Sequence, residues 1–247
     1  MPLVLGRRSS LLAAFVLFGA SRTSRARADE AAPANPVQHT HELWTLGDST
    51  AQSLGEAMAS LLKGDSLKAR NIFRNSSGLT RTDFFDWPKT VKPLIASHAP
   101  EALLLSFGAN DTQGLFIASE RRVAQLGTPE WGDEYAKRVR AFVDLFTDKG
   151  TEVFILGQPF DPSRKYAPLM RAVNDAFKKA AEHGARSTYI DGEGILADTD
   201  GHFQKTILDS HGKPVPLRND DGIHMTSEGA RYLATRVLDI VRKKLAG

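Results

Sequence analysis

Three short segments of this sequence contain side chains that together could carry out nucleophilic catalysis. Ser49 offers a hydroxyl nucleophile, Asn110 an uncharged amide donor, and His224 an imidazole close to carboxylates. A serine becomes a useful nucleophile when a base removes its proton, and the oxyanion formed at an attacked carbonyl is stabilised by hydrogen-bond donors. These residue types favour acyl-transfer chemistry if the fold brings them together.

The first two segments each have a simpler structural interpretation. Gly47-Asp48-Ser49 precedes a helix-forming stretch that starts at Ala51, where a helix N-terminus would favour developing negative charge. Asp and Ser are also the preferred helix caps. In Gly108-Ala109-Asn110-Asp111, the glycine lets the backbone approach a ligand and the amide can donate to an oxyanion. Taken alone, that segment is more simply a turn.

The third segment, Asp220-Asp221-Gly222-Ile223-His224, places a carboxylate three residues before a histidine. One short loop could fold so that Asp221 accepts from the imidazole, which fixes the tautomer and leaves the second ring nitrogen free as a base. Asp220 is a rival partner, but the spacing of Asp221 suits the tight turn better. A lone histidine is otherwise an ordinary surface or core residue.

The elements that must position these residues follow the alternation of apolar runs and amphipathic stretches that is typical of a mostly parallel sheet. Strands are expected at Leu43–Leu46, Ala69–Phe73, Ala102–Phe107, Glu152–Leu156 and Ser187–Ile190. Helices are expected at Ala51–Lys63, Phe84–His98, Asp133–Lys149, Ala167–His183 and Ser227–Leu245, the second interrupted near its prolines. Segments 112–130 and 193–219 fit neither and are expected to be functional loops. Ligands bind at the carboxyl ends of parallel strands, where the Ser49 and Asn110 segments would lie.

Over Leu43–Val241 the chain resembles the SGNH (GDSL-type) hydrolase superfamily. The resemblance lies in Gly47-Asp48-Ser49, Gly78, Gly108-Ala109-Asn110-Asp111 and Asp221-Gly222-Ile223-His224. The stretch Asp83–Pro88 is similar to an exported bacterial branch of poorly characterised function. Thr50 departs from the leucine of the namesake pattern, which argues against lipase-like members of the superfamily.

The resemblance implies an α/β fold, a three-layer α/β/α sandwich with a mostly parallel five-stranded sheet of the flavodoxin-like type. Ser49 would attack an ester, His224 would act as base and then acid, and Asp221 would orient the imidazole. The implied oxyanion hole consists of the backbone N–H groups of Ser49 and Gly78 and the amide of Asn110. Asp111 would orient its loop. Neither a metal nor a cofactor is needed.

The charge distribution argues against a nucleic-acid partner. The formal charge is +3, but residues 1–28 hold five arginines and no acid; without them, 27 basic residues stand against 29 acidic ones, a charge of −2. A basic footprint for phosphate backbones is therefore absent.

Residues 1–28 have the pattern of a cleavable signal peptide: Arg7-Arg8, the apolar run Leu11–Ala20, and Ala26-Arg27-Ala28. The apolar run is too short for a membrane span, so we expect a periplasmic or secreted protein without stable membrane insertion. The arginine pair fits the Sec route and loosely the twin-arginine route. Residues 29–41 are expected to be a flexible lead-in, and 42–247 the hydrolase-like domain.

Several weaker features favour ordinary structural roles. The chain has no cysteine, which excludes disulfides and thiolate chemistry. His39 and His41 are interpreted as part of a solvated lead-in rather than as metal ligands. Asp198-Thr199-Asp200-Gly201 resembles the start of a calcium loop but fits a hairpin turn better. Core packing is the simpler interpretation of four aromatic residues that could line a carbohydrate platform, Trp87, Trp131, Phe160 and Tyr166.

These observations predict an exported serine esterase that cleaves or transfers O-acyl groups, most simply O-acetyl groups of envelope carbohydrate or peptidoglycan. The alternative is a non-catalytic glycan-binding or polysaccharide-assembly protein on the same fold. The presence of every catalytic residue type favours the enzyme.

Overall fold

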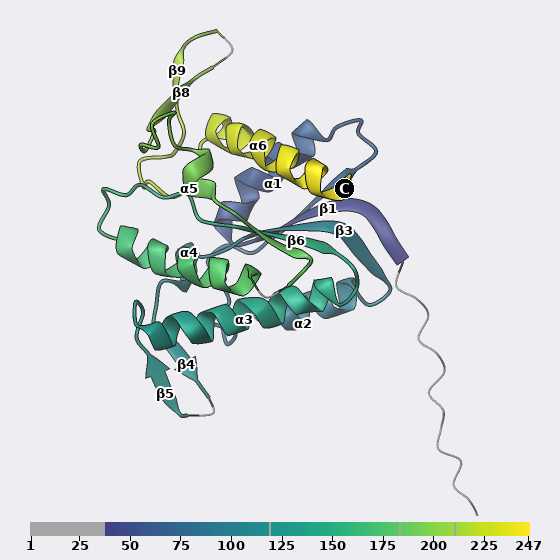
Figure 1. Ribbon diagram of the computed structural model, residues 1–247, viewed down its shortest axis with the longest axis vertical. Coiled ribbons are helices and arrows are strands. Elements are labelled where there is room, and N and C mark those ends of the chain that lie inside the picture. Colours follow the sequence, from purple (N-terminus) through teal and green to yellow (C-terminus); the bar gives the residue numbers. More distant parts are fainter. Residues whose placement is uncertain (1–37, 119, 183, 210) are drawn as a thin grey trace, which may run out of the picture. The chain divides into compact units, whose positions relative to one another are not determined.

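The computed structural model describes residues 38–118, 120–182, 184–209 and 211–247. The expected signal peptide and the first part of the lead-in lie outside these residues. Five parallel strands form the central sheet in the order β2-β1-β3-β6-β7 (Figure 1). Their bounds are Gln38–Gly47 for β1, Lys68–Phe73 for β2, His98–Ser106 for β3, Glu152–Leu156 for β6 and Ser187–Ile190 for β7. The predicted five-stranded parallel sheet is confirmed.

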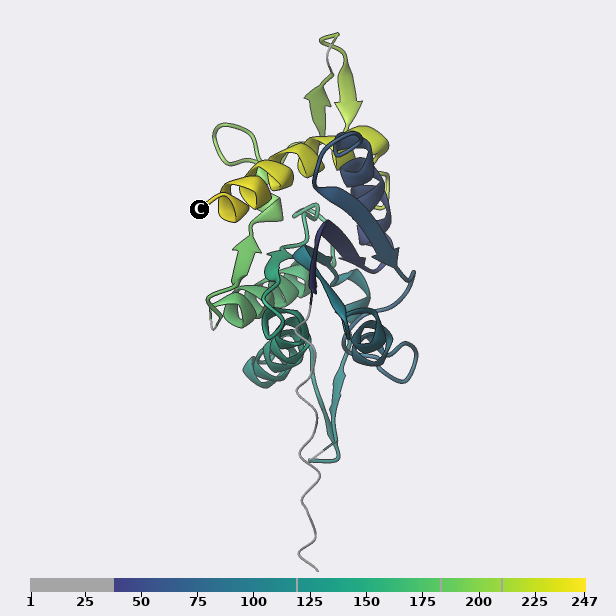
Figure 2. The same ribbon diagram turned by 90° about the vertical axis from the view of Figure 1, so that its right-hand side faces the viewer.

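Helices cover both faces of the sheet (Figures 1 and 2). Alternate residues of a strand point to opposite faces, and in β3 Leu104 packs with helices α1 (Ser49–Leu61) and α6 (Ser227–Leu245), while Leu103 and Leu105 pack with the other helices. Those are α2 (Trp87–Leu94), α3 (Pro129–Thr147) and α4 (Ala167–Ala181). The three-layer α/β/α sandwich is therefore confirmed, and burial on both faces explains why β3 is a nearly continuous apolar run.

Strand β1 begins earlier than the domain start expected at Glu42. Gln38–Thr40 pair with His98–Pro100 of β3, and the register shifts between Thr40 and Leu43. Residues 38–41 are thus part of the sheet instead of a flexible lead-in. Within this strand, His41 contacts the carboxylate of Glu101 through Nδ1.

Capping residues set the helix starts. Thr128 accepts from the backbone N–H of Trp131 and Pro129 lies in the first turn, so α3 starts four residues before the expected Asp133. Asp86 caps α2, which is shorter than the expected Phe84–His98 and contains Pro93. The last helix has the expected bounds.

The two segments expected to lack regular structure contain short elements. Two antiparallel hairpins occur there, β4 (Leu115–Ile117) with β5 (Arg122–Ala124) and β8 (Thr206–Leu208) with β9 (Pro214–Pro216). They also contain the four-residue helix α5 (Gly192–Ile195) and the start of α3. The expectation was wrong here because a three-residue strand is too short to show an alternating pattern. Among the described helices, none combines the length and apolar character needed to cross a bilayer.

Candidate active site

Ser49 is the first residue of α1 and follows the carboxyl end of β1. Asp48 is the N-cap, and its Oδ1 accepts from the backbone N–H and the hydroxyl of Thr50 at 2.8 and 2.7 Å. The cap interpretation of Asp48 is therefore confirmed. Because the first N–H groups of a helix lack an intrahelical acceptor, the N–H of Ser49 is available to a ligand.

His224 bridges Ser49 and Asp221. Its Nε2 lies 2.9 Å from Oγ of Ser49, and its Nδ1 lies 2.7 Å from Oδ2 of Asp221. Burial opposes the charge of Asp221, but hydrogen bonds from the His224 side chain and from the backbone N–H groups of Ile223 and His224 outweigh it, so the pKa of Asp221 is lowered. The rival Asp220 does not take this place: Nδ1 of His224 bonds to Asp221, and the backbone carbonyl of Asp220 accepts from Arg164.

The loop between β6 and α4, residues 157–166, holds the turn that carries Asp221 and His224. Arg164 Nη2 donates to the carbonyl of Asp220 at 2.6 Å, and the hydroxyl of Tyr166 donates to the carbonyl of Asp221 at 3.1 Å. The backbone of Gly222 adopts a φ of +74°, and a Cβ there would lie 2.7 Å from the Tyr166 hydroxyl. The positive φ thus favours glycine, and a Cβ would displace the Tyr166 hydroxyl that helps to hold the turn.

Arg218 anchors the same turn and was not singled out from the sequence. Its side chain is only 8% exposed. Its Nε donates to the carbonyl of Pro159 at 3.1 Å, and its guanidinium lies 4.7 Å from the ring centroid of Phe203. Burial lowers the pKa of Arg218 to about 10. An arginine two residues before a pair of aspartates carries no sequence signal for this role, because the groups that it contacts are distant in the chain.

Asn110 lies in a short 3₁₀ turn, Ala109–Asp111, after β3. Its amide Nδ2 is 3.2 Å from Oδ2 of Asp48, so Asp48 connects the serine turn to the asparagine turn. Asp48 is fully buried, and this burial raises its pKa from 3.8 to about 6 despite hydrogen bonds from Thr50 and Asn110. One amide hydrogen of Asn110 is held by Asp48, which leaves the second available to a ligand oxygen.

Asp111 fixes the loop that carries Gly78. Its Oδ1 accepts from the backbone N–H groups of Leu79 and Thr80, both at 2.8 Å, and its Oδ2 accepts from the hydroxyl of Tyr135 at 2.6 Å. A Cβ on residue 78 would lie 2.2 Å from Oδ1 of Asp111, so only glycine fits there. Burial raises the pKa of Asp111, although these hydrogen bonds oppose the shift.

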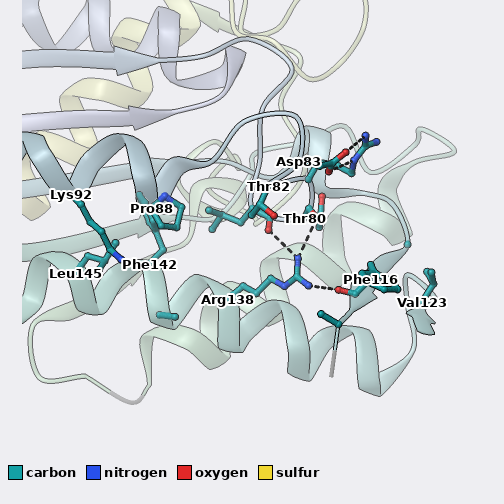
Figure 3. A pocket seen from close by; sticks show the side chains of 15 residues that line it. Thr80, Thr82, Asp83, Pro88, Lys92, Phe116, Val123, Arg138, Phe142 and Leu145 are labelled. Carbon is teal, nitrogen blue, oxygen red and sulfur yellow. Dashed lines mark hydrogen bonds and ion pairs between the residues drawn. The ribbon is translucent and has the colours of Figure 1, made fainter. Parts of the chain in front are cut away.

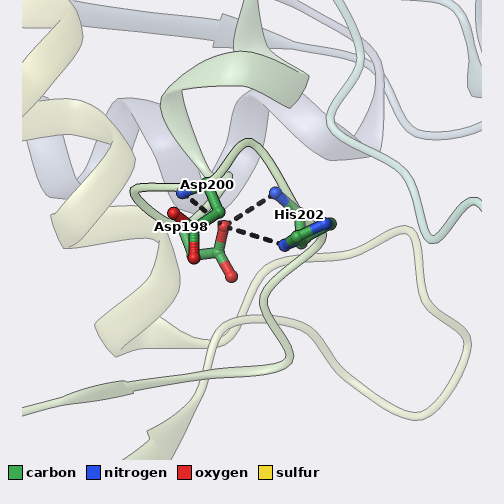
Figure 4. A group of neighbouring side chains, drawn as sticks. All are labelled: Asp198, Asp200 and His202. Atoms are coloured by element: carbon green, nitrogen blue, oxygen red, sulfur yellow. Dashed lines mark hydrogen bonds and ion pairs between the residues drawn. The ribbon is translucent and has the colours of Figure 1, made fainter.

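The secondary candidates have structural explanations. Figure 4 shows Asp198, Asp200 and His202 in a hairpin turn, where Oδ1 of Asp198 accepts from the backbone N–H groups of the other two at 3.0 and 2.7 Å. Trp87, Trp131 and Phe160 are buried in the core, so no carbohydrate platform forms from the four aromatic residues. Tyr166, the fourth, is half-buried.

Solved structures with hydrolase and acyltransferase names share this fold. A GDSL-like lipase from Bacteroides thetaiotaomicron is 11% identical, with 83% of this chain and 89% of that chain covered and a TM-score of 0.54. An acetyl xylan esterase is 17% identical, with 81% and 99% covered and a TM-score of 0.54. The catalytic domain of peptidoglycan O-acetyltransferase A from Streptococcus pneumoniae is 12% identical, with 85% and 95% covered and a TM-score of 0.51.

The SGNH hydrolase fold expected from the sequence is thereby confirmed. No curated protein matches the chain. A family profile described as "Protein of unknown function (DUF459)" matches residues 42–240, most of the described chain. The chain therefore belongs to the DUF459 family.

Proposed function

We propose that this protein is a serine esterase or acyltransferase in which Ser49, His224 and Asp221 form the catalytic triad. The observation that carries the proposal is the unbroken path from Oγ of Ser49 through both imidazole nitrogens of His224 to the Asp221 carboxylate, with steps of 2.9 and 2.7 Å. This arrangement lets a serine attack an ester while its proton moves to the imidazole.

In the first half-reaction, Oγ of Ser49 forms a bond to the carbonyl carbon and its proton passes to Nε2 of His224. Asp221 stabilises the imidazolium that results. The oxyanion would accept hydrogen bonds from the backbone N–H groups of Ser49 and Gly78 and from the amide of Asn110. When the tetrahedral intermediate collapses, the alkoxide leaves with the proton of His224 and the acyl group stays on Ser49. In the second half-reaction, water or an acceptor hydroxyl attacks the acyl carbon and gives its proton to Nε2 of His224. The bond from the acyl carbon to Oγ of Ser49 then breaks, and Oγ takes that proton back.

The proposed substrate is an O-acetylated glycan of the cell envelope. An acetyl xylan esterase and a peptidoglycan O-acetyltransferase are among the solved structures with this fold. Export by a signal peptide over residues 1–28, which we also propose, would bring the protein to such a substrate. N-terminal sequencing of the exported protein should give a chain starting at Asp29.

Acetate release from acetylated xylan and O-acetylated peptidoglycan, with and without an acceptor sugar, tests the proposed activity. Ser49→Ala and His224→Ala should each lower turnover by about 10⁴-fold or more, and the double variant should lose little beyond that because the triad acts as a unit. Ser60→Ala and His98→Ala, at exposed positions away from the triad, are the matched controls. Full turnover in Ser49→Ala would exclude the serine mechanism, and binding of glycan without turnover in the wild type would favour a non-catalytic protein.

A further inference from the structure

A cavity of about 760 Å³ lies between α2, α3, the loop of residues 79–83 and the β4–β5 hairpin (Figure 3). We call it the α2–α3 cavity. Its walls are mainly apolar and include Leu79, Pro88, Phe116, Val123, Phe142 and Leu145. None of the three proposed triad residues lines it. A cavity of this size matches sites that bury small organic ligands, which are roughly 300–1,000 Å³.

The β4–β5 hairpin presents apolar side chains on both of its faces. Leu115 and Ile117 of β4 are buried in the core, as expected for one face of a two-stranded ribbon. On the other face, Phe116 pairs directly with Val123 and the two are 54% and 48% exposed. A solvent-facing pair in a hairpin is ordinarily polar, so this pair favours an apolar ligand in the cavity that it lines.

Arg138 of α3 links three walls of the cavity. Its guanidinium donates to the carbonyls of Leu79 and Thr80 at 3.4 and 3.3 Å and to the carbonyl of Phe116, as Figure 3 shows. These bonds fix the loop and the hairpin to the same helix. A cavity whose walls are held in this way is formed before a ligand arrives, which lowers the entropy cost of binding.

The charges on the cavity rim favour an anion at one end. Arg81 pairs with Asp83 at 2.7 Å, and Arg138 pairs with Glu134 at 3.4 Å. Lys92 has no ion-pair partner in the part of the chain that the structure describes. In Figure 3 it lies at the opposite end of the cavity from Phe116 and Val123. A ligand lying along the cavity would thus have an anionic group beside Lys92 and an apolar chain against the hairpin.

We propose that the α2–α3 cavity binds an anionic amphiphile with an acyl-type chain, at a site separate from Ser49. The apolar walls would bury the chain, and Lys92 would pair with the carboxylate or phosphate headgroup. The wall residue Leu79 directly follows Gly78, so this site adjoins the loop that carries a proposed oxyanion donor.

The test is fluorescence titration of the full chain with 11-(dansylamino)undecanoic acid and with its uncharged primary amide. Both titrations are carried out on the wild type and on Ser49→Ala, so that binding is measured whether or not the protein is an esterase, and each further variant is made in both backgrounds. We expect one saturable site. The double change Phe116→Thr/Val123→Thr removes apolar lining and should raise the Kd at least about tenfold. Ala141→Trp adds bulk at an exposed lining position on α3 and should raise the Kd by a similar factor. Leu208→Thr, at a 67% exposed leucine in the other hairpin, is the matched control and should leave the Kd unchanged.

A second pair of variants tests whether Lys92 binds the anionic headgroup. Lys92→Glu should weaken binding of the acid and leave binding of the amide unchanged, whereas Lys89→Glu, in the same helix but outside the cavity lining, should change neither. Circular dichroism and thermal unfolding verify that each variant is folded. Absence of saturable binding, or equal affinity in wild-type, Phe116→Thr/Val123→Thr and Ala141→Trp backgrounds, would overturn the site. Equal weakening of acid and amide by Lys92→Glu would overturn the anionic headgroup. Tight binding in the wild type that is lost on Ser49→Ala would place the probe at Ser49 and refute the separate site.

Discussion

Asp48 shows a conflict between stability and the proposed catalysis at the scale of a single residue. Its carboxylate is buried, and its pKa is raised from 3.8 to about 6. Between these two values the folded protein binds more protons than the unfolded chain, so the stability contribution of Asp48 falls as pH rises through this window. Above it, the buried charge costs on the order of 3 kcal/mol.

The variant Asp48→Asn should therefore be more stable than wild type at pH 7 to 8, with a difference that shrinks as the pH approaches 4. Its Oδ1 can still accept from Thr50, but its Nδ2 would face the amide of Asn110 and the bond between positions 48 and 110 would be lost. We therefore expect a lower kcat together with the gain in stability. Thermal unfolding from pH 4 to 8 and kinetics at pH 7.5 measure the two effects. Parallel pH dependence of unfolding in the two proteins would contradict the assignment.

Asn110 tests the proposed oxyanion hole without altering the triad. Because its amide would strengthen its hydrogen bond only as charge develops, Asn110→Ala should lower kcat by about 10²- to 10³-fold with little change in KM. Asn75→Ala, at an exposed position of the β2–α2 connection, is the control and should have no effect. A normal kcat for Asn110→Ala would reduce the segment to a structural turn.

At the scale of elements, the turn with Asp221 and His224 depends on the β6–α4 loop. The backbone N–H of Asp161 donates to the carbonyl of Gly222 at 3.3 Å, in addition to the bonds from Arg164 and Tyr166. A carboxylate–imidazole pair is effective only when both groups keep their orientation. The β6–α4 loop therefore positions the proposed base from outside its own segment.

Gly222→Ala should impair both stability and turnover. A Cβ at this φ of +74° costs about 1–2 kcal/mol, and it would also meet the Tyr166 hydroxyl at 2.7 Å and displace the turn. We expect kcat to fall about tenfold or more, which corresponds to at least ~1.4 kcal/mol in the barrier. Gly201→Ala isolates the backbone effect, because its φ is +81° and nothing lies within 4 Å. It should lower the melting temperature but leave kcat unchanged; similar kinetics for both variants would refute the positioning role.

At the scale of the molecule, the face of the sheet that carries α2, α3 and α4 is packed with aromatic rings. Phe142 contacts Phe107 and Phe146 edge-to-face, with centroids 5.9 and 5.7 Å apart, and Phe146 contacts Trp44 at 6.4 Å. In a chain without cysteine this core supplies the cohesion that disulfides cannot.

Phe146→Ala should lower the free energy of unfolding by about 3–5 kcal/mol, because the ring is fully buried and its removal leaves a cavity. Urea denaturation measures this loss. Phe73→Ala, at a 39% exposed position at the end of β2, is the control and should cost much less. The folded fraction of Phe146→Ala should keep the wild-type kcat, since the ring lies in none of the proposed site contacts. Equal destabilisation by the two variants would contradict this account of the core.

How much of the fold the sequence could predict depended on the length of the local pattern. Apolar runs and stripes report which contiguous residues are buried, so the five strands and the bounds of Ser227–Leu245 were predicted correctly. The two hairpins of three-residue strands were missed because so few residues show no period. The earlier start of β1 was missed as well, because Gln38–Thr40 become a strand through pairing with β3, about 60 residues away.

The same distinction between local patterns and contacts of distant segments applies to the candidate site. Residue types and positions at strand ends were enough to select the segments of Ser49, Asn110 and the Asp221–His224 turn. The 2.9 Å approach of Ser49 to His224 joins residues 175 positions apart, and the Asp48–Asn110 bond joins residues 62 apart. The anchoring of the turn by Arg218 and the open α2–α3 cavity likewise arise between distant segments. The sequence by itself determined which residues and elements exist, because these depend on local composition and periodicity. Only the tertiary structure decided which groups meet, because contacts between distant segments leave no local pattern to read.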